Sequence, residues 1–140
     1  MSMDEAVTEL LTTTHTWAVV GASPDPTRAS HRVARQLQGW GFRVIPVSPN
    51  AGGELLGERC YRSLADIPAE EGVDVVDVFR RRDQAGRHVD EAIARGVRGV
   101  WLQLGVIDEE AADRARRAGL LVVMDRCPAI ELPRLAATLN

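Results

Sequence analysis

Short runs of β-branched and other apolar residues alternate with stretches of helical periodicity along most of this chain. The apolar runs cover residues 16–20, 42–47, 73–79, 97–102 and 120–124. They are apolar almost throughout rather than at every second position, which is typical of strands covered on both faces. Strands separated by helices, joined by right-handed crossovers, predict a doubly wound α/β fold with a parallel sheet and helices on both faces.

The stretches between the apolar runs predict four helices. They cover residues 30–38, a segment capped by Asp83 and ended by Gly96, a segment capped by Asp108 and ended by Gly119, and residues 130–139. A shorter helical piece is expected at 63–67, within the irregular portion 51–72, and Pro46 predicts irregular pairing in its strand. No linker or repeat interrupts the pattern, so we expect residues 1–140 to form a single domain.

Composition excludes several functions. All 17 basic side chains are arginine, whereas a P-loop, a Schiff-base enzyme and a protein kinase each need a lysine. The net charge of -3 argues against a nucleic-acid partner that is held by bulk electrostatics. No apolar run approaches the about 18 residues of a membrane span, and the first fifteen residues lack the apolar core of a signal peptide. Cys60 and Cys127 are expected as free thiols in a cytoplasmic protein.

Ligands of open parallel sheets bind outside the carboxyl ends of the strands, so the residues after each strand are candidates for a site. After the first strand, Gly21 permits a tight turn and Arg28 offers a bidentate phosphate donor. The next helix begins near Ser30, where its free N–H groups favour an anion. The alternative interpretation of this loop is an ordinary strand-to-helix connection with Ser30 as the cap.

A positive cluster, Phe79-Arg80-Arg81-Arg82, follows the third strand, and Gly105 follows the fourth. Such a cluster is often only a solvated charge run, but its expected position beside Arg28 favours anion binding. An NAD(P)-dependent oxidoreductase is an alternative on the same fold. The glycines of its fingerprint are replaced by Ser23 and Pro26, and residues 47–50 contain no acid for a ribose hydroxyl.

No catalytic constellation is predicted. Cys127 has no evident base beside it, and Asp77, inside an apolar strand, is expected to have a structural hydrogen-bond partner if it is buried. The three histidines lack the spacing of metal ligands, so no metal site is expected. These residues indicate a protein that binds a ligand and has no evident catalytic machinery of its own.

Six segments together resemble a known family. In chain order they are VVGASPDPTRASHRV (19–33), VIPVSPN (44–50), GERCYRSLADIP (57–68), VDVVDVFRRRD (73–83), VWLQLGV (100–106) and VVMDRCP (122–128). They are similar to the small stand-alone CoA-binding proteins, which are Rossmann-like domains resembling the CoA-binding domain of the succinyl-CoA synthetase alpha subunit. The resemblance covers nearly the whole chain from about residue 15. It implies a bacterial cytoplasmic protein with a five-stranded 3-2-1-4-5 sheet, and coenzyme A as the cofactor.

The resemblance also implies a role for each matched position. The pyrophosphate region would be held by Gly21, Ala22, Ser23, Arg28 and Ser30. The adenosine and its 3′-phosphate would be met by Arg43, Ser48, Pro49 and Asn50. Phe79 and Arg80 would flank the adenine side, and the residues from Gln103 to Gly105 would line the path of the pantetheine arm.

One departure from the family's pattern is Ser48, where the family commonly has asparagine, so that contact loses a donor. A complete ligase is excluded, because a phosphohistidine domain and an ATP-grasp partner do not fit in 140 residues. A chain that supplies the CoA site to a separate acyl-CoA ligase stays an alternative. The oligomeric state and any protein partner are left open.

Overall fold

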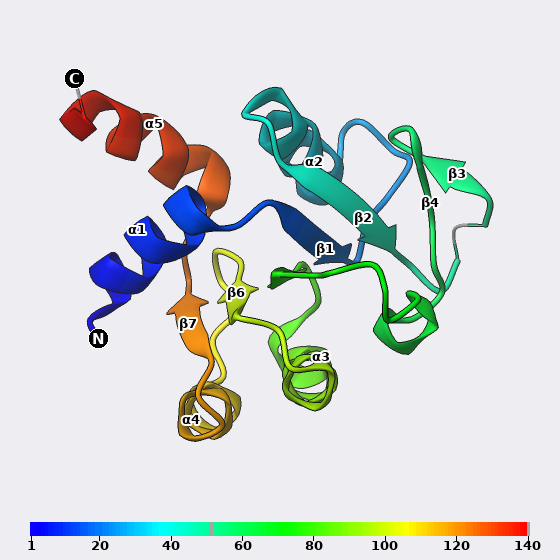
Figure 1. The fold of residues 1–140 in the computed structure, drawn as a ribbon. Helices are drawn as coiled ribbons and strands as arrows, with labels where there is room; N and C mark the ends of the chain where they lie inside the picture. Colours follow the sequence, from blue (N-terminus) through cyan, green and yellow to red (C-terminus); the bar gives the residue numbers. More distant parts are fainter. Residues whose placement is uncertain (51, 140) are drawn as a thin grey trace.

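A parallel sheet with helices on both sides forms the centre of the computed structural model, which describes residues 1–50 and 52–139 (Figure 1). The strands are β1 (Thr16–Val20), β2 (Arg43–Val47), β3 (Glu54–Leu55), β4 (Glu58–Arg59), β5 (Val75–Val78), β6 (Gly99–Leu102) and β7 (Leu121–Met124). The helices are α1 (Met3–Thr13), α2 (Ala29–Gly39), α3 (Arg82–Arg95), α4 (Glu109–Arg117) and α5 (Pro128–Leu139), with a short 3-10 helix, η1 (Leu64–Asp66).

The main sheet has the order β2-β1-β5-β6-β7, and every neighbouring pair is parallel. On the outer side of β2, Tyr61 forms a single parallel bridge to Val47 and so takes the position of a third strand. If the Tyr61 segment is counted as position 3, and β5 and β6 as positions 4 and 5, the order corresponds to the expected 3-2-1-4-5 pattern. The Rossmann-like fold is confirmed. Because the chain passes from β2 on one side of β1 to β5 on the other, the carboxyl ends of these three strands meet at a switch point.

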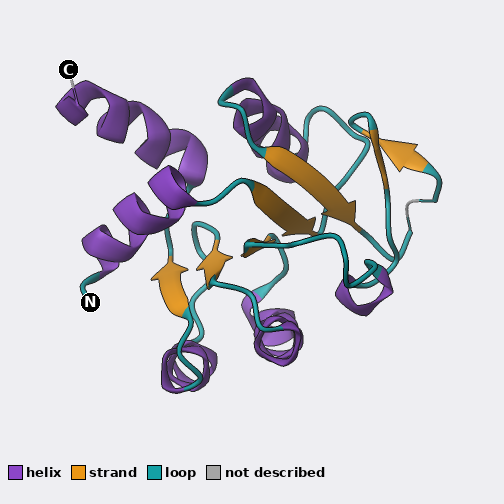
Figure 2. Ribbon diagram, in the orientation of Figure 1, coloured by secondary structure: helices purple, strands orange, loops and turns teal. Residues whose placement is uncertain are grey.

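Each face of the sheet has its own core. Along β1, Trp17 and Val19 pack with α1, α2 and α5, whereas Ala18 and Val20 pack with α3, α4 and η1. Figures 1 and 2 show these two helical layers on opposite sides of the strands. This arrangement explains why the strands are apolar at successive positions, since a strand covered on both faces has no solvent side.

Helix α1 was not among the expected elements. Ser2 and Glu5 form a reciprocal capping box at its start, and Leu10 and Leu11 are buried against the sheet. Helix α1 packs closely on β6 at Gly99. A Cβ at this position would lie only 2.8 Å from both terminal methyl carbons of Leu10. The small antiparallel hairpin of β3 and β4 was also not predicted. Among the described residues, no helix is both long and apolar enough to span a bilayer.

Three local predictions need correction. The N-cap of helix α3 is Arg81. Asp83 lies in the first turn, where its carboxylate interacts favourably with the helix dipole but does not cap the helix. Helix α2 begins after Arg28, so Ser30 lies in its first turn and is not the cap. Pro46 pairs in regular register with Val19, because its carbonyl, and with it the nitrogen that carries no hydrogen, faces Tyr61 on the outer side of β2.

Other terminal signals are confirmed. The Asp108 side chain caps α4 by accepting from the Ala111 N–H at 3.0 Å. Arg114, Arg116 and Arg117 lie in the last turn of α4, as the helix dipole favours. Gly96 ends α3 with a φ of 78°.

Candidate functional site

A cavity of about 580 Å³ opens where the carboxyl ends of β1, β2 and β5 meet. We call it the main cleft. Its walls are formed by Gly21, Ala22, Ser23, Pro24, Arg28, Ala29, Ser30, Ser48, Pro49, Asn50, Phe79, Arg80 and Arg81. The structure therefore brings together three segments that are far apart in the sequence. Of the residues predicted for a site, Arg43, Gln103, Leu104 and Gly105 are not on its described walls.

Gly21 makes the turn that forms the floor of the main cleft. Its φ is 90°, and a Cβ at this position would lie 2.8 Å from the carbonyl oxygen of Phe79. The N–H groups of Gly21 and Ala22 donate to the Val47 carbonyl at 2.9 and 3.2 Å. These two N–H groups bind the turn to β2 and are not available to a phosphate, so what Gly21 contributes to the main cleft is the space that a side chain would fill.

The N-terminus of α2 supplies backbone donors to the same cavity. Its N-cap residue, Arg28, makes no side-chain capping bond, and Ala29 and Ser30 in the first turn line the main cleft. The first N–H groups of a helix have no intrahelical acceptor and carry the positive end of the helix dipole. The preceding loop is held by Asp25, which accepts from the N–H and hydroxyl of Thr27 at 2.9 and 2.7 Å. These bonds lower the pKa of Asp25.

The charge of the main cleft is positive. Arg28, Arg80 and Arg81 line it, and none of the described residues on its walls is acidic. Arg81 forms an exposed ion pair with Asp83 at 3.6 Å, whereas Arg28 and Arg80 have no ion pair within the described part of the chain. Three guanidinium groups beside a helix N-terminus favour an anionic ligand such as a phosphate ester.

The residues after β2 are held in place from the outer side of the sheet. The Ser48 N–H donates to the Tyr61 carbonyl at 2.9 Å, and the Ser48 hydroxyl accepts from the Asn50 N–H at 3.4 Å. Ser48 is buried, while Pro49 and Asn50 are exposed. Pro49 and Asn50 therefore form an accessible wall of the main cleft on a supported turn.

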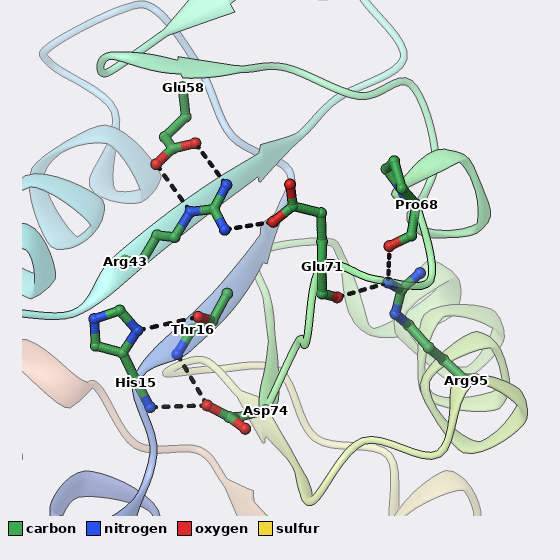
Figure 3. A network of polar contacts seen from close by, with 8 residues as sticks. All are labelled: His15, Thr16, Arg43, Glu58, Pro68, Glu71, Asp74 and Arg95. Carbon is green, nitrogen blue, oxygen red and sulfur yellow. Dashed lines mark hydrogen bonds and ion pairs between the residues drawn. The ribbon is translucent and has the colours of Figure 1, made fainter.

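Arg43 lies at the opposite end of the sheet. It is the first residue of β2, and Figure 3 shows its guanidinium between Glu58 and Glu71. Its Nε donates to Glu58 at 3.1 Å and its Nη1 donates to Glu71. The hydrogen bonds to Glu58, and next those to Glu71, raise the pKa of Arg43. The expectation that Arg43 meets the adenosine is inconsistent with this position, because the main cleft lies beyond the last residue of the strand and Arg43 is the first.

The same end of the sheet holds a wider structural network (Figure 3). Asp74 accepts from the N–H groups of His15 and Thr16 at 2.8 and 3.0 Å. Arg95 donates to four carbonyl groups in the segment 64–71, including that of Pro68 at 2.9 Å. These contacts join β1, α3 and the loop before β5, so the charges there stabilise the fold.

Gln103 and Gly105 follow β6 at the same edge as the main cleft, but outside its walls. Gln103 is 7% exposed, and its Oε1 has no hydrogen-bond partner among the described residues. The Gly105 N–H donates to Asp125 Oδ1 at 2.8 Å. These positions leave Gln103 and Gly105 as candidates for the more distant arm of a long ligand.

The side chains that could act as a nucleophile or as an acid lie away from the main cleft. Cys127 is a buried free thiol that does not line it. Asp77 is fully buried, and neither carboxyl oxygen has a hydrogen-bond partner within the described residues, contrary to our expectation of a structural partner. Burial raises the pKa of Asp77 well above its ordinary value. In the described part of the chain, no group of three or more His, Cys, Asp and Glu side chains is arranged to hold a metal ion.

Comparison with known proteins identifies the family. The CoA binding domain family matches residues 15–133. The chain belongs to this family. The uncharacterized protein YneT of Bacillus subtilis is 36% identical over 121 residues, covering 86% of this chain and 87% of that protein. The solved structure of a hypothetical protein from Pyrococcus horikoshii OT3 matches with a TM-score of 0.88 and 37% identity, over 97% of this chain and 93% of that one.

A larger relative has a name that states an activity. The acetate–CoA ligase [ADP-forming] I of Archaeoglobus fulgidus is 28% identical over 123 residues, which are 79% of this chain and 17% of the ligase. The chain therefore corresponds to a small part of that ligase. The resemblance inferred from the six sequence segments is confirmed at the level of the family.

Three residues of the main cleft were not predicted as site residues. They are Pro24, Ala29 and Arg81. Arg81 belongs to the arginine cluster that the sequence singled out, and Ala29 follows from the position of the α2 N-terminus. Ala29 would have been found if the helix had been predicted to begin one residue earlier. Arg81 would have been found if the whole arginine cluster had been assigned to the site.

Proposed function

We propose that this chain is a single CoA-binding domain, residues 1–140, which binds CoA or acyl-CoA in the main cleft in the cytoplasm and has no catalytic machinery of its own. The observation that carries the proposal is the positive cavity of about 580 Å³ at the switch point, with three arginines and no acidic residue on its described walls. A diphosphate ester fits this chemistry, whereas the ribose hydroxyls of NAD call for an acid after β2. Membership of the CoA binding domain family supports the same ligand.

In this proposal the ligand lies across the three post-strand segments. The diphosphate is bound by the α2 N-terminus, by the Ser23 and Ser30 hydroxyls and by Arg28. The adenosine lies between Pro49 and Asn50 on one side and Phe79 and Arg80 on the other. The pantetheine arm extends along the sheet edge toward Gln103 and Gly105, since these residues follow the strand next to β5.

Isothermal titration calorimetry with CoA, ADP and NAD tests the proposal. We expect CoA to bind, NAD to bind at least about 10-fold more weakly, and the CoA affinity to fall as salt rises. Arg28→Gln is expected to weaken CoA binding about 10- to 100-fold, because it removes a charge-assisted contact. Failure of CoA to bind, or tighter binding of NAD, would overturn the proposal in favour of another ligand.

Arg43→Gln separates the structural arginine from those of the site. We expect it to lower the free energy of unfolding by about 1 kcal/mol, since the ion pairs with Glu58 and Glu71 are about one third exposed and screened. CoA affinity is expected to stay within about 2-fold, because Arg43 lies at the far end of β2. Urea denaturation and calorimetry measure both quantities. A large loss of CoA affinity at unchanged stability would return Arg43 to the site.

A further inference from the structure

A second, smaller cavity of about 170 Å³ lies beside the main cleft. We call it the side cavity. It shares Gly21, Pro49 and Arg80 with the main cleft, so the two cavities adjoin. The remaining walls are formed by Val20, Val47, Arg62, Ser63, Arg87, His88 and Glu91. None of these seven was predicted to be a site residue.

The pairing of Tyr61 with β2 brings Arg62 and Ser63 to the side cavity. The Tyr61 N–H donates to the Pro46 carbonyl at 3.0 Å, and the Tyr61 carbonyl accepts from Ser48 at 2.9 Å. These two bonds fix the backbone immediately before Arg62. Ser63 is the N-cap of η1, but its hydroxyl makes no capping bond. Among the described residues the hydroxyl has no other side-chain hydrogen bond, so it is able to donate to a ligand.

Helix α3 supplies the opposite wall. Glu91 follows Arg87 by four residues and His88 by three, so its side chain is a neighbour of both on the helix surface. His88 Nδ1 lies 2.6 Å from Glu91 Oε1, so the one carboxylate on the wall is already hydrogen-bonded. His88 Nε2 is buried and has no hydrogen-bond partner among the described residues. Because Nδ1 donates to the Glu91 carboxylate, Nε2 of the neutral imidazole is an acceptor. Buried polar atoms in folded proteins are almost always paired, so a ligand hydroxyl, and not a phosphate oxygen, is a fitting partner for Nε2.

The side cavity has three arginines without partners. Arg62, Arg80 and Arg87 form no ion pair or side-chain hydrogen bond with any described residue, in contrast to Arg43, Arg95 and Arg114. Arg62 and Arg87 reach it from separate elements, the segment after Tyr61 and helix α3. Three guanidinium groups around a small space, with a single engaged carboxylate, leave an excess of positive charge. A compact dianion is the ligand group that this charge favours.

We propose that the side cavity binds a phosphate monoester that belongs to the same ligand as the diphosphate in the main cleft, with Arg62 and Arg87 as the residues that recognise it. The inference rests on the proposed function, under which this group is the 3′-phosphate of CoA. Under this inference, two arginines outside the main cleft distinguish CoA from dephospho-CoA, and Arg43 does not.

Calorimetric titration of CoA and dephospho-CoA into the wild-type protein and into Arg62→Gln and Arg87→Gln tests this inference. The two ligands differ only in the 3′-phosphate. We expect the wild type to prefer CoA by about 10-fold or more, and each variant to lose most of that preference while its affinity for dephospho-CoA stays within about 2-fold. Arg62 and Arg87 are exposed, so both variants are expected to fold. Arg117→Gln, an exposed arginine on α4, is the matched control and is expected to change neither affinity.

The same comparison with adenosine 3′,5′-bisphosphate and 5′-AMP removes the pantetheine arm and should give the same loss of preference. The inference is overturned if the wild type binds CoA and dephospho-CoA equally, or if the variants weaken both ligands to the same extent. In either case binding of both ligands leaves the proposed function standing. If neither ligand binds the wild type, the proposed function fails and this inference fails with it.

Discussion

Gly21→Ala is expected to abolish CoA binding and to lower the free energy of unfolding by about 3 kcal/mol. The φ of 90° at this position is unfavourable for any residue with a Cβ, and the new methyl group would lie 2.8 Å from the Phe79 carbonyl oxygen. Because that oxygen belongs to the backbone, the turn after β1 must move away from β5 to accommodate the methyl group. The movement displaces the floor of the main cleft. Urea denaturation and calorimetry with CoA measure the two effects.

Gly119→Ala provides the control for backbone strain alone. Gly119 has the same φ of 90°, but a Cβ there would meet nothing within 4 Å. We expect Gly119→Ala to cost about 1–2 kcal/mol of stability and to leave CoA binding intact. If both variants lose the same stability and both bind CoA, the close approach of β1 to Phe79 has no role in shaping the site.

Asp77→Asn is expected to raise the free energy of unfolding at pH 8, by an amount that becomes smaller as the pH falls toward about 4. The Asp77 carboxyl is fully buried without a hydrogen-bond partner among the described residues, and burial raises its pKa. An acid with a higher pKa in the folded state binds its proton more tightly there than in the unfolded chain, where the pKa is about 3.9. Stability is therefore lost as the pH rises from about 4 toward the folded-state pKa, by up to about 1.4 kcal/mol per pH unit. The amide removes this loss, because it does not ionise.

Urea denaturation of both proteins between pH 5 and 8 measures the difference, and other titrating groups cancel in the comparison. Parallel pH profiles for the wild type and Asp77→Asn would show that Asp77 does not titrate abnormally. Asp74→Asn is the matched control with the opposite sign. Its carboxylate accepts two backbone N–H groups, and we expect its replacement to cost about 1 kcal/mol.

The sequence predicted most of the main cleft because that site lies on short segments that directly follow strands. Once the strands are assigned as parallel, Gly21, Ser48 and Phe79 must come to one edge of the sheet. Arg43 was placed at the wrong end of its strand. It is the first residue of β2, whereas the main cleft lies beyond the last residue of that strand. Its pairing with Glu58 and Glu71 depends on an irregular segment whose path has no periodicity to predict it.

The side cavity was beyond prediction from sequence. Arg62 reaches it through a single bridge between Tyr61 and Val47, and Arg87 reaches it from the middle of a helix whose rotation depends on packing. Local patterns do not encode either contact. The buried Asp77 is a similar case, since its position in a strand was clear but the lack of a partner depends on the side chains around it in three dimensions.

By itself, the sequence determined the class of the fold, the parallel direction of its strands and the edge of the sheet at which the candidate site lies. These follow from the period of apolar residues and from glycine and arginine at the strand ends, which are local properties. Only the tertiary structure decided which arginines are paired and which are free, because an ion pair requires two side chains to approach across the fold. That distinction moves Arg43 into the structural network and leaves Arg62, Arg80 and Arg87 without an ion pair among the described residues, on the walls of the side cavity.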